Sequence, residues 1–193
     1  MVSGISKKIL AELQKNLTGV KDEEGEKFIE MLQTSKTVFV AGAGRSGLVA
    51  KAFAMRLMHL GFSVHAVGGS VTPPIKKNDL MVVISGSGET SSVRIAVEAA
   101  KKHGAKIASL TGSAGSSVAR LSDVVVIVPM SVPRAKSQDY IANQLEGITS
   151  TLTPLGTVFE LSALVLCDSV IAELMDRMGI SEEMMRQKHA NLE

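Results

Sequence analysis

Residues 80–92 have the sequence LMVVISGSGETSS, in which five apolar residues in a row lead into a loop of glycines and hydroxyl-bearing residues. An apolar run without polar alternation is typical of a strand in a parallel sheet that is covered on both faces. Residues 92–103 then repeat apolar positions at helical spacing and end at Gly104. A buried strand, a glycine-rich loop and a helix in this order form one unit of an α/β fold.

Four further runs rich in β-branched residues flank this unit, and amphipathic stretches separate them. Because each helical stretch is followed by a strand, the units are βα repeats with right-handed crossovers. The sequence therefore predicts an α/β fold, a three-layer sandwich with a five-stranded parallel sheet in the common order 2-1-3-4-5 and helices on both faces. The expected strands are 37–41, 63–67, 80–84, 106–110 and 124–128, and the helices between them are 48–60, 92–103 and 116–121.

Helical patterns are also found at both ends of the chain. Residues 5–17 and 22–32 are expected to be helices that cover another element. Thr153-Pro154 is typical of a helix start, and the apolar helix that follows should end at Gly179. That helix is apolar on more than one side, so we expect it at a subunit interface. We predict a single domain over residues 1–193, with residues 1–36 as N-terminal helices and residues 154–193 as C-terminal interface helices.

The composition excludes several classes of protein. Hydrophobic residues make up 45% and charged residues 21% of the 193 residues, as in a globular domain and unlike a disordered chain. The 21 basic and 19 acidic residues are scattered, which argues against nucleic acid as a partner. No apolar stretch approaches the roughly 18 residues that cross a bilayer, and the first residues lack a secretory segment. We therefore expect a cytoplasmic protein without nucleic acid or membrane partners.

The cysteine and histidine residues indicate whether the chain could form a metal site. The one cysteine, Cys167, excludes a disulfide framework and a cysteine-based zinc site, and it is expected to be a packed thiol. His59 and His65 lie in apolar contexts and His103 precedes a helix-ending glycine, so all three are expected to be structural. Their spacing provides no metal triad with carboxylates. We therefore expect neither a metal nor a cofactor.

The first expected strand leads into residues 42–47, GAGRSG, which match the dinucleotide-binding pattern G-x-G-x-x-G. A nicotinamide-binding unit usually has an acidic residue about 20 residues further on to hold the ribose. Residues 42–78 contain no acidic residue. What remains is a general anion site at a helix N-terminus, with Gly44, Arg45 and Ser46 as candidate ligands. Arg45 could pair there with a phosphate or with an acidic neighbour.

The loop after the third strand carries three hydroxyls and two glycines within six residues. Gly86 and Gly88 let the backbone approach an anion closely, while Ser85, Ser87 and Thr90 supply hydrogen-bond donors. In the strand order above, this loop and the first one face each other at the carboxyl end of the sheet, where ligands of such folds bind. The two loops together predict a phosphate cradle. The alternative is that their glycines and serines only end strands and cap helices.

These residues resemble a known family. The loop SGSGET, residues 85–90, is similar to the signature of SIS (sugar isomerase) domains, which bind phosphosugars on a five-stranded parallel sheet of flavodoxin-like order. The chain also resembles the 6-phospho-3-hexuloisomerases over nearly its whole length, in residues 42–47, 54–62, 155–160 and 189–192. The resemblance implies interconversion of D-arabino-hex-3-ulose 6-phosphate and fructose 6-phosphate in the ribulose monophosphate pathway of formaldehyde assimilation. It further implies a functional partner, 3-hexulose-6-phosphate synthase, and a homotetramer, a dimer of dimers, without a metal.

The resemblance also implies roles for two residues. Glu160 is expected to carry a proton between C2 and C3 of the sugar through an enediol or enediolate. Its apolar neighbours Val158, Phe159 and Leu161 suit a carboxyl that takes up and releases protons; the alternative is a solvated glutamate at a helix start. His189 is expected to enter a neighbouring subunit's site and to act in ring opening or on the C2 and C3 oxygens. The alternative is a solvated histidine near the chain end.

Other functions remain open from the residues alone. The cradle also suits an aldose–ketose isomerase that acts on another phosphosugar, such as a five-carbon one. It suits a non-catalytic phosphosugar-sensing module too, although residues 1–36 are too short and too weakly basic to form the DNA-binding helix-turn-helix that such sensors commonly carry. Arg134 and Lys136, in the long segment after the last strand, could close over the substrate or be solvated.

Overall fold

The computed structural model describes residues 2–130 and 156–189 of the chain. Five parallel strands form one sheet in the order β2-β1-β3-β4-β5, as the sequence predicted. The third strand is buried along its whole length, which explains its uninterrupted apolar sequence. The strands are β1 (Val38–Ala41), β2 (Val64–Ala66), β3 (Leu80–Ile84), β4 (Lys106–Thr111) and β5 (Val124–Ile127).

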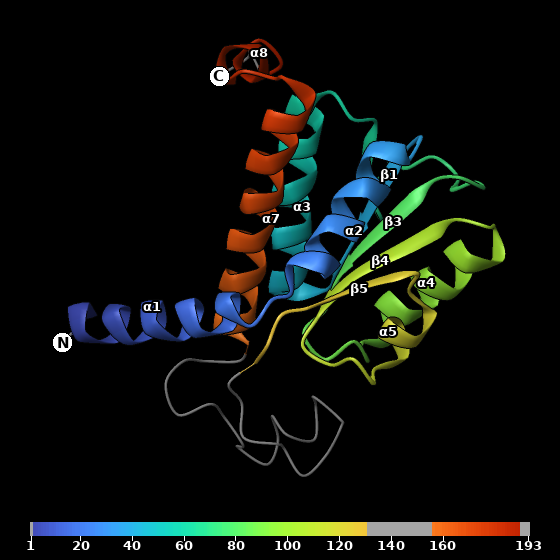
Figure 1. Ribbon diagram of the computed structural model, residues 1–193. Coiled ribbons are helices and arrows are strands. Elements are labelled where there is room, and N and C mark those ends of the chain that lie inside the picture. The colour runs from blue at the N-terminus through green and yellow to red at the C-terminus, as the bar shows by residue number, and fades with distance from the viewer. Residues whose placement is uncertain (1, 131–155, 190–193) are drawn as a thin grey trace.

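Helices cover both faces of the sheet, so the predicted three-layer α/β sandwich is confirmed (Figure 1). One face packs against α2, α3 and α7, around Phe28, Phe53 and Phe159. The other face packs against α4 and α5, around Val83 and Val97. The helices of these two layers are α2 (Asp22–Thr34), α3 (Gly44–Leu60), α4 (Ser91–Lys102), α5 (Ser117–Leu121) and α7 (Thr157–Met178).

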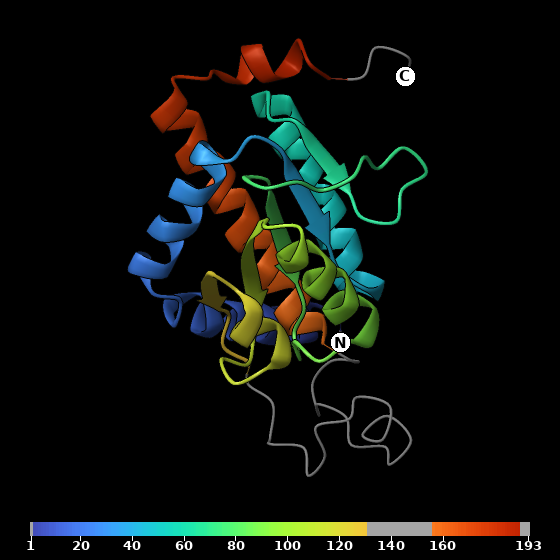
Figure 2. The same ribbon diagram turned by 90° about the vertical axis from the view of Figure 1, so that its right-hand side faces the viewer.

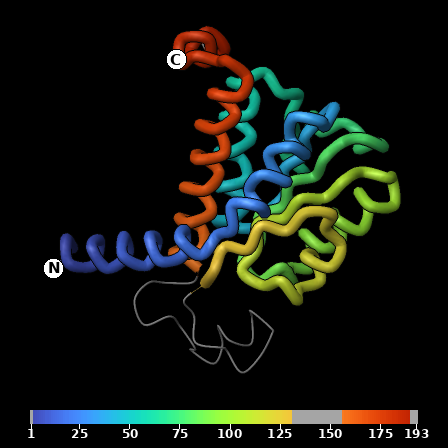
Figure 3. The backbone as a smooth tube through the Cα atoms, viewed as in Figure 1, coloured from blue at the N-terminus to red at the C-terminus, as the bar shows by residue number. Residues whose placement is uncertain are grey.

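Two further helices, α1 (Val2–Thr18) and α8 (Glu182–Arg186), lie at opposite ends of α7 (Figure 3). The α1 helix extends away from the body and touches it along α7, where Asn16 Nδ2 donates to Ser162 Oγ at 3.4 Å. Most of the α1 surface is exposed, whereas α2 packs on the sheet. Within the described residues, no helix combines the length and the apolar character needed to span a membrane.

The start of one helix differs from the expected one, and the expected start of another is not tested. The α3 helix begins at Gly44 instead of residue 48, so its first turn takes in residues that the sequence placed in a loop. Glycine is a poor helix former, but a close fit requires it here, because a Cβ on Gly47 would lie 2.7 Å from the Gly42 carbonyl oxygen. The predicted start at Thr153-Pro154 lies outside the described residues, and the described part of α7 begins at Thr157.

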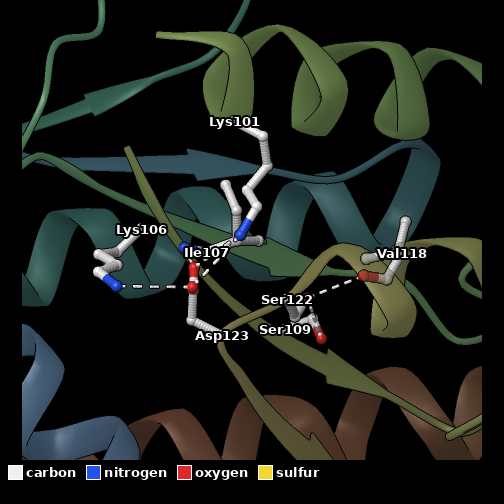
Figure 4. Close-up of polar contacts among 7 residues, drawn as sticks. All are labelled: Lys101, Lys106, Ile107, Ser109, Val118, Ser122 and Asp123. Carbon is white, nitrogen blue, oxygen red and sulfur yellow. Dashed lines mark hydrogen bonds and ion pairs between the residues drawn. The ribbon is translucent and has the colours of Figure 1, made fainter. Parts of the chain in front are cut away.

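A polar cluster fastens the α4–α5 layer to the sheet (Figure 4). Asp123, just before β5, accepts hydrogen bonds from the Ile107 N–H (2.8 Å) and Lys101 Nζ (3.3 Å) and pairs with Lys106 (3.6 Å). Partial burial works to raise the pKa of Asp123, but these hydrogen bonds and charges outweigh it and hold the pKa below its usual value. The adjacent Ser122 hydroxyl donates to a carbonyl of α5 (2.9 Å), so β4, β5, α4 and α5 are held as one unit.

Candidate active site

Three segments meet at the carboxyl end of the sheet. β1 and β3 are paired neighbours, so residues 42–47 and 85–90 leave the same edge side by side. The first turn of α7 reaches this edge as well, because a Cβ added to Gly86 would lie 3.1 Å from the Phe159 ring. In Figure 2 the start of α7, in orange, lies at this end of the molecule and α8, in red, at the other. The candidate site is therefore built by α3, α4 and α7 together.

These three helices share a feature at their first turns. They start after Ala43, Thr90 and Gly156, and none of these N-cap residues makes a side-chain hydrogen bond to its helix. Ser116 and Ser181 cap α5 and α8, and acidic residues lie in the first turn of α2 and, as Glu160, in that of α7, so only α3 and α4 among these have neither feature. Because the first N–H groups of a helix need an acceptor, the starts of α3 and α4, which meet at one edge, are suited to an anion.

The predicted phosphate cradle, residues 85–90, is hydrogen-bonded to the loop that follows β4. The Gly86 carbonyl accepts hydrogen bonds from the Gly112 N–H (3.0 Å) and the Thr111 hydroxyl (3.3 Å). The Gly88 carbonyl accepts one from the Val118 N–H in α5 (3.1 Å). Since C=O and N–H of a trans peptide point in opposite directions, the N–H that follows Gly86 is directed away from this loop.

The hydroxyls of the cradle act as acceptors within it. Ser85 Oγ accepts from the Gly88 N–H and Ser87 Oγ from the N–H two residues on, both at 3.2 Å. As acceptors, both hydroxyls keep their own hydrogens to donate to a ligand. Ser85 is buried, whereas Ser87 and Thr90 are half-buried. In the part of the chain that the structure describes, nothing accepts the N–H groups of Gly86 and Ser87, so they remain for an anion.

A buried carboxylate lies beside the uncapped helices. Glu160, in the first turn of α7, is only 9% exposed, and its Oε2 accepts a hydrogen bond from Arg45 Nε in the first turn of α3. Glu160 is therefore not a solvated glutamate, and Arg45 has an acidic neighbour as its partner. The two side chains lie in a cavity of about 150 Å³ whose other walls are Leu48, Val49, Leu161 and Leu164.

His189 lies far from this carboxylate within one chain. It follows α8, and α7 with its 22 residues spans about 33 Å between the two ends. The exposed His189 ring lies 5.2 Å from the ring of buried His59. Burial lowers the pKa of His59, and nearby His189 and Arg56 lower it further. A single chain therefore does not bring His189 and Glu160 together.

The residues expected to be structural are placed accordingly. His65 packs against Phe39 with ring centroids 5.6 Å apart, and His103 is the C-cap of α4. Cys167 is fully buried, and burial raises the pKa of its thiol, so it is a packed thiol. Within residues 2–130 and 156–189 there is no group of three or more His, Cys, Asp or Glu side chains that could hold a metal. Arg134 and Lys136 lie outside the described residues.

A third loop lies at the site and was not among the loops predicted from the sequence. Residues 111–117, TGSAGSS, follow β4 and support the cradle, and Glu89 Oε1 accepts the Ser117 N–H at 2.7 Å. The glycine and serine content of this loop resembles that of the other two and could have indicated its place at the same edge. Phe159 was treated only as an apolar neighbour of Glu160, because nothing local in the sequence indicates that it packs against Gly86.

Comparison with known proteins finds similarity along the whole chain. Residues 31–164 match the SIS domain family. The chain is 51% identical over 158 residues to an uncharacterized protein of Aeropyrum pernix, covering 82% of this chain and 74% of that protein. It is 41% identical over 186 residues to 3-hexulose-6-phosphate isomerase of Bacillus subtilis, covering 96% and 95% of the two chains. Its identity to the enzyme of that name from Methylomonas aminofaciens is 40% over 185 residues, 96% of each chain.

Solved structures share the fold. One crystal structure of a hypothetical protein has a TM-score of 0.85 and 38% identity, covering 99% of this chain and 97% of that one. A Methanococcus jannaschii protein, for which a 3-hexulose-6-phosphate isomerase function was inferred from its crystal structure, has a TM-score of 0.78 and 35% identity. That similarity covers 98% of this chain and 97% of the other.

Proposed function

The chain belongs to the SIS domain family, and from that membership we propose that it is a phosphosugar isomerase that interconverts D-arabino-hex-3-ulose 6-phosphate and fructose 6-phosphate. One observation carries the proposal: the starts of α3 and α4, which have neither a side-chain cap nor an acidic first turn, meet at the cradle, and a buried carboxylate lies beside them. An anion site next to a carboxyl in an apolar cavity is what isomerisation of a phosphorylated ketose requires.

The phosphoryl group is proposed to lie between the starts of α3 and α4. Backbone N–H groups there carry the partial positive charge of the helix ends, and the glycines allow the backbone to come close. Hydroxyls complete the set of donors, as in other anion sites at helix N-termini. The proposed ligands are Gly44, Arg45 and Ser46 on α3 and Ser85, Gly86, Ser87, Gly88 and Thr90 in the cradle.

Glu160 is proposed to move the proton. In the 3-ketose, C2 carries hydrogen and C3 the carbonyl. Removal of the C2 proton by the carboxylate turns the C–H electron pair into the C2–C3 double bond of an enediolate, and the C3 oxygen takes up a proton. Return of a proton to C3, with loss of the proton on the C2 oxygen, completes fructose 6-phosphate. One carboxylate between adjacent carbons can serve both transfers.

His189 is proposed to act from a neighbouring subunit of a homotetramer, since its own chain holds it at the far end of α7. Fructose 6-phosphate closes its ring through the C5 oxygen, so the ring must open before enolisation. The 3-ketose could close a five-membered ring only through the C6 oxygen, which is phosphorylated. His189 therefore serves the fructose side, or the C2 and C3 oxygens during enolisation. The 3-ketose is proposed to come from a synthase that condenses formaldehyde with ribulose 5-phosphate in the cytoplasm.

Deuterium labelling tests the reaction. The protein is incubated with fructose 6-phosphate in heavy water, and the labelled carbon is located by NMR. A C2–C3 enediol places deuterium at C3, whereas an aldose–ketose isomerase places it at C1. Label at C1 alone would reject the proposal in favour of another phosphosugar isomerase. Absence of both label and 3-ketose product, with fructose 6-phosphate still bound, would favour a sensing module.

A Glu160→Gln variant tests the proposed base. The amide keeps the shape of the side chain but cannot take up the C2 proton, so we expect kcat to fall about 1,000-fold. Affinity for fructose 6-phosphate, measured by calorimetry, should change less than about threefold, because the phosphate ligands are intact. Normal turnover in this variant would remove Glu160 as the base.

A further inference from the structure

Glu89, the one acidic residue of the cradle, has no part in the reaction proposed above. It lies between the cradle and α5, where its Oε1 accepts the Ser117 N–H at 2.7 Å. Glu160, in contrast, lies in the apolar cavity and pairs with Arg45. The two carboxylates near the phosphate loops therefore have different surroundings, and each suits a different task.

Glu89 belongs to a set of bonds that satisfies the whole first turn of α5. The N–H groups of Ser117, Val118 and Ala119 donate in succession to Glu89 Oε1, the Gly88 carbonyl and the Ser116 hydroxyl. Two of the three acceptors belong to the cradle. A helix of five residues has few other bonds to hold its start, so the position of α5 depends on the cradle. The position of the cradle depends on α5 through the same bonds.

The contact between these two segments leaves no free space. Gly88 has a φ of 65°, and a Cβ on it would lie 2.1 Å from Ser116 Oγ and 3.2 Å from Thr111 Oγ1. A shift of the Ser116 region toward the cradle would therefore displace Gly88. The Gly88 N–H in turn bonds to Ser85 Oγ, so the displacement would reach the hydroxyls that are proposed to bind phosphate.

The electrostatic setting of Glu89 agrees with a role as a fixed acceptor. Partial burial works to raise its pKa, but the hydrogen bonding of Ser117, followed by the charges of Arg120 and Arg94, outweighs burial and holds the pKa below its usual value. The side chain is therefore a carboxylate throughout the neutral range. A carboxylate accepts an N–H at a helix start more strongly than a neutral group does.

We propose that Glu89 is a positioning residue that, through the Ser117 N–H, holds the β4–α5 loop against the cradle and thereby keeps the cradle's N–H and hydroxyl groups aimed at the phosphoryl group. Glu160 carries the proton, and Glu89 sets phosphate affinity without touching the reacting carbons. The assignment rests on the proposed function in one respect, that the cradle binds a phosphoryl group.

Two substitutions separate positioning from proton transfer. Glu89→Gln keeps an oxygen that can accept the Ser117 N–H, whereas Glu89→Ala removes the acceptor. For Glu89→Ala we expect the KM for fructose 6-phosphate and the Ki of inorganic phosphate to rise about tenfold, with kcat within about threefold of the wild type. Glu89→Gln should stay within about threefold in all three constants. Glu98→Ala, which removes a glutamate that is exposed on α4, is the control and should match the wild type.

Removing the donor tests the same bond from the other side. Ser117 is the first residue of α5, where proline is tolerated because the helix itself does not use that N–H. Ser116, with φ −71° and ψ 160°, already has the extended backbone that precedes proline. Ser117→Pro should therefore reproduce the rise in KM and Ki, and the double variant with Glu89→Ala should add no more than about twofold.

The outcomes distinguish this proposal from the proposed function. Loss of kcat in Glu89→Gln would make Glu89 a proton carrier. An unchanged Ki of inorganic phosphate in both Glu89→Ala and Ser117→Pro would show that the Glu89–Ser117 bond does not shape the cradle. Either result overturns the assignment. Thermal unfolding shows whether each variant is folded. If Glu89→Ala does not fold, Ser117→Pro still tests the bond. Calorimetric titration of the wild type with inorganic phosphate and with fructose 6-phosphate tests the proposed function independently of these variants. If the wild type binds neither compound, the proposed function is refuted.

Discussion

A carboxylate that is 9% exposed needs a partner, and Glu160 has one in Arg45. Burial disfavours an isolated charge, so the guanidinium stabilises the ionised carboxyl across the contact of α3 with α7. The Arg45 Nε binds Oε2, while Oε1 lies near Gly156, where an added Cβ would be 3.6 Å away. Arg45 thus orients the carboxylate and leaves one oxygen unclaimed by the guanidinium.

Replacing Arg45 tests this orientation. Arg45→Met keeps much of the side-chain length but removes the charge and the donors. We expect kcat to fall about 10- to 100-fold with a smaller rise in KM, and Arg45→Lys to recover part of the loss. Steady-state kinetics with fructose 6-phosphate measures both constants, and Lys51→Met, on an exposed position of α3, should leave them unchanged. A large rise in KM at constant kcat would instead mean that Arg45 acts only as a phosphate ligand and does not orient Glu160.

Asp123 contributes stability that depends on pH. Its pKa is lowered in the folded protein, so the contribution is fully present above the pKa of an unfolded aspartate and is lost as the pH falls through the lower folded value. Asp123→Asn keeps an oxygen for the Ile107 N–H and removes the charge that two lysines face. We expect the free energy of unfolding to drop by about 1 kcal/mol at pH 7 and by less at about pH 3.

Urea denaturation at the two pH values measures this difference. The exposed Asp168→Asn is the matched control and should show no pH-dependent change relative to the wild type. Equal destabilisation of Asp123→Asn at both pH values would mean that packing of the side chain matters and its charge does not.

At the scale of elements, the five strands and their order were predicted because their information is local. Each strand is a short apolar or β-branched run between turn residues, and parallel pairing follows from the helices between them. The start of α3 was predicted four residues too late, because the low helix propensity of Gly44 and Gly47 favours a loop. In the structure these glycines allow residues 42 and 47 to touch, and that contact is what the first turn requires.

The contacts that complete the site could not be predicted in the same way. The Arg45–Glu160 pair joins residues 115 apart in the sequence, and the Glu89–Ser117 bond joins residues 28 apart. Neither has a local pattern, because both depend on which helix starts meet at one edge of the sheet. The candidate residues of the cradle could be proposed from the sequence because a single loop contains them all.

Gly88 shows how strictly one element is fitted to another. Gly88→Ala would add a Cβ 2.1 Å from Ser116 Oγ at a positive φ, so the cradle, the start of α5 or both must move. We expect the free energy of unfolding to fall by about 1–3 kcal/mol and the binding of inorganic phosphate to become unmeasurable. Gly115→Ala, in the adjacent loop, meets nothing within 4 Å and should leave both quantities unchanged. Unfolding and calorimetric titration check the pair, and wild-type phosphate affinity in Gly88→Ala would contradict it.

At the scale of the whole molecule, the apolar surface is not fully covered by one chain. Leu10 on the projecting α1 is 63% exposed, and Leu48, beside the cavity on α3, is 65% exposed. Val165 on α7 is 41% exposed. These exposed apolar side chains on α1, α3 and α7 are consistent with the proposed homotetramer, in which a second copy would cover them. The proposed assembly would let His189, at the far end of α7, enter the site of a neighbouring subunit.

Complementation between two inactive variants tests whether a site is shared by two subunits. Glu160→Gln and His189→Gln are expected to be nearly inactive when each is produced alone. In a mixed pair, one site combines both substitutions, but the other combines an intact Glu160 from one chain with an intact His189 from its partner. Random pairing makes half of the pairs mixed, so co-produced chains should recover about a quarter of the wild-type activity.

The recovered activity distinguishes a site shared by two subunits from a site within one chain, because the two arrangements give different numbers of intact sites. If Glu160 and His189 served the same site within one chain, every site in every mixture would carry one substitution, and no activity would return. The measurement is the rate per subunit after co-expression and purification of all chains through one shared tag, which keeps the random mixture of pairs, with a mixture of separately purified variants as the control. High activity of His189→Gln by itself would show that the histidine is not needed, whereas recovery near a quarter would place it in the partner's site.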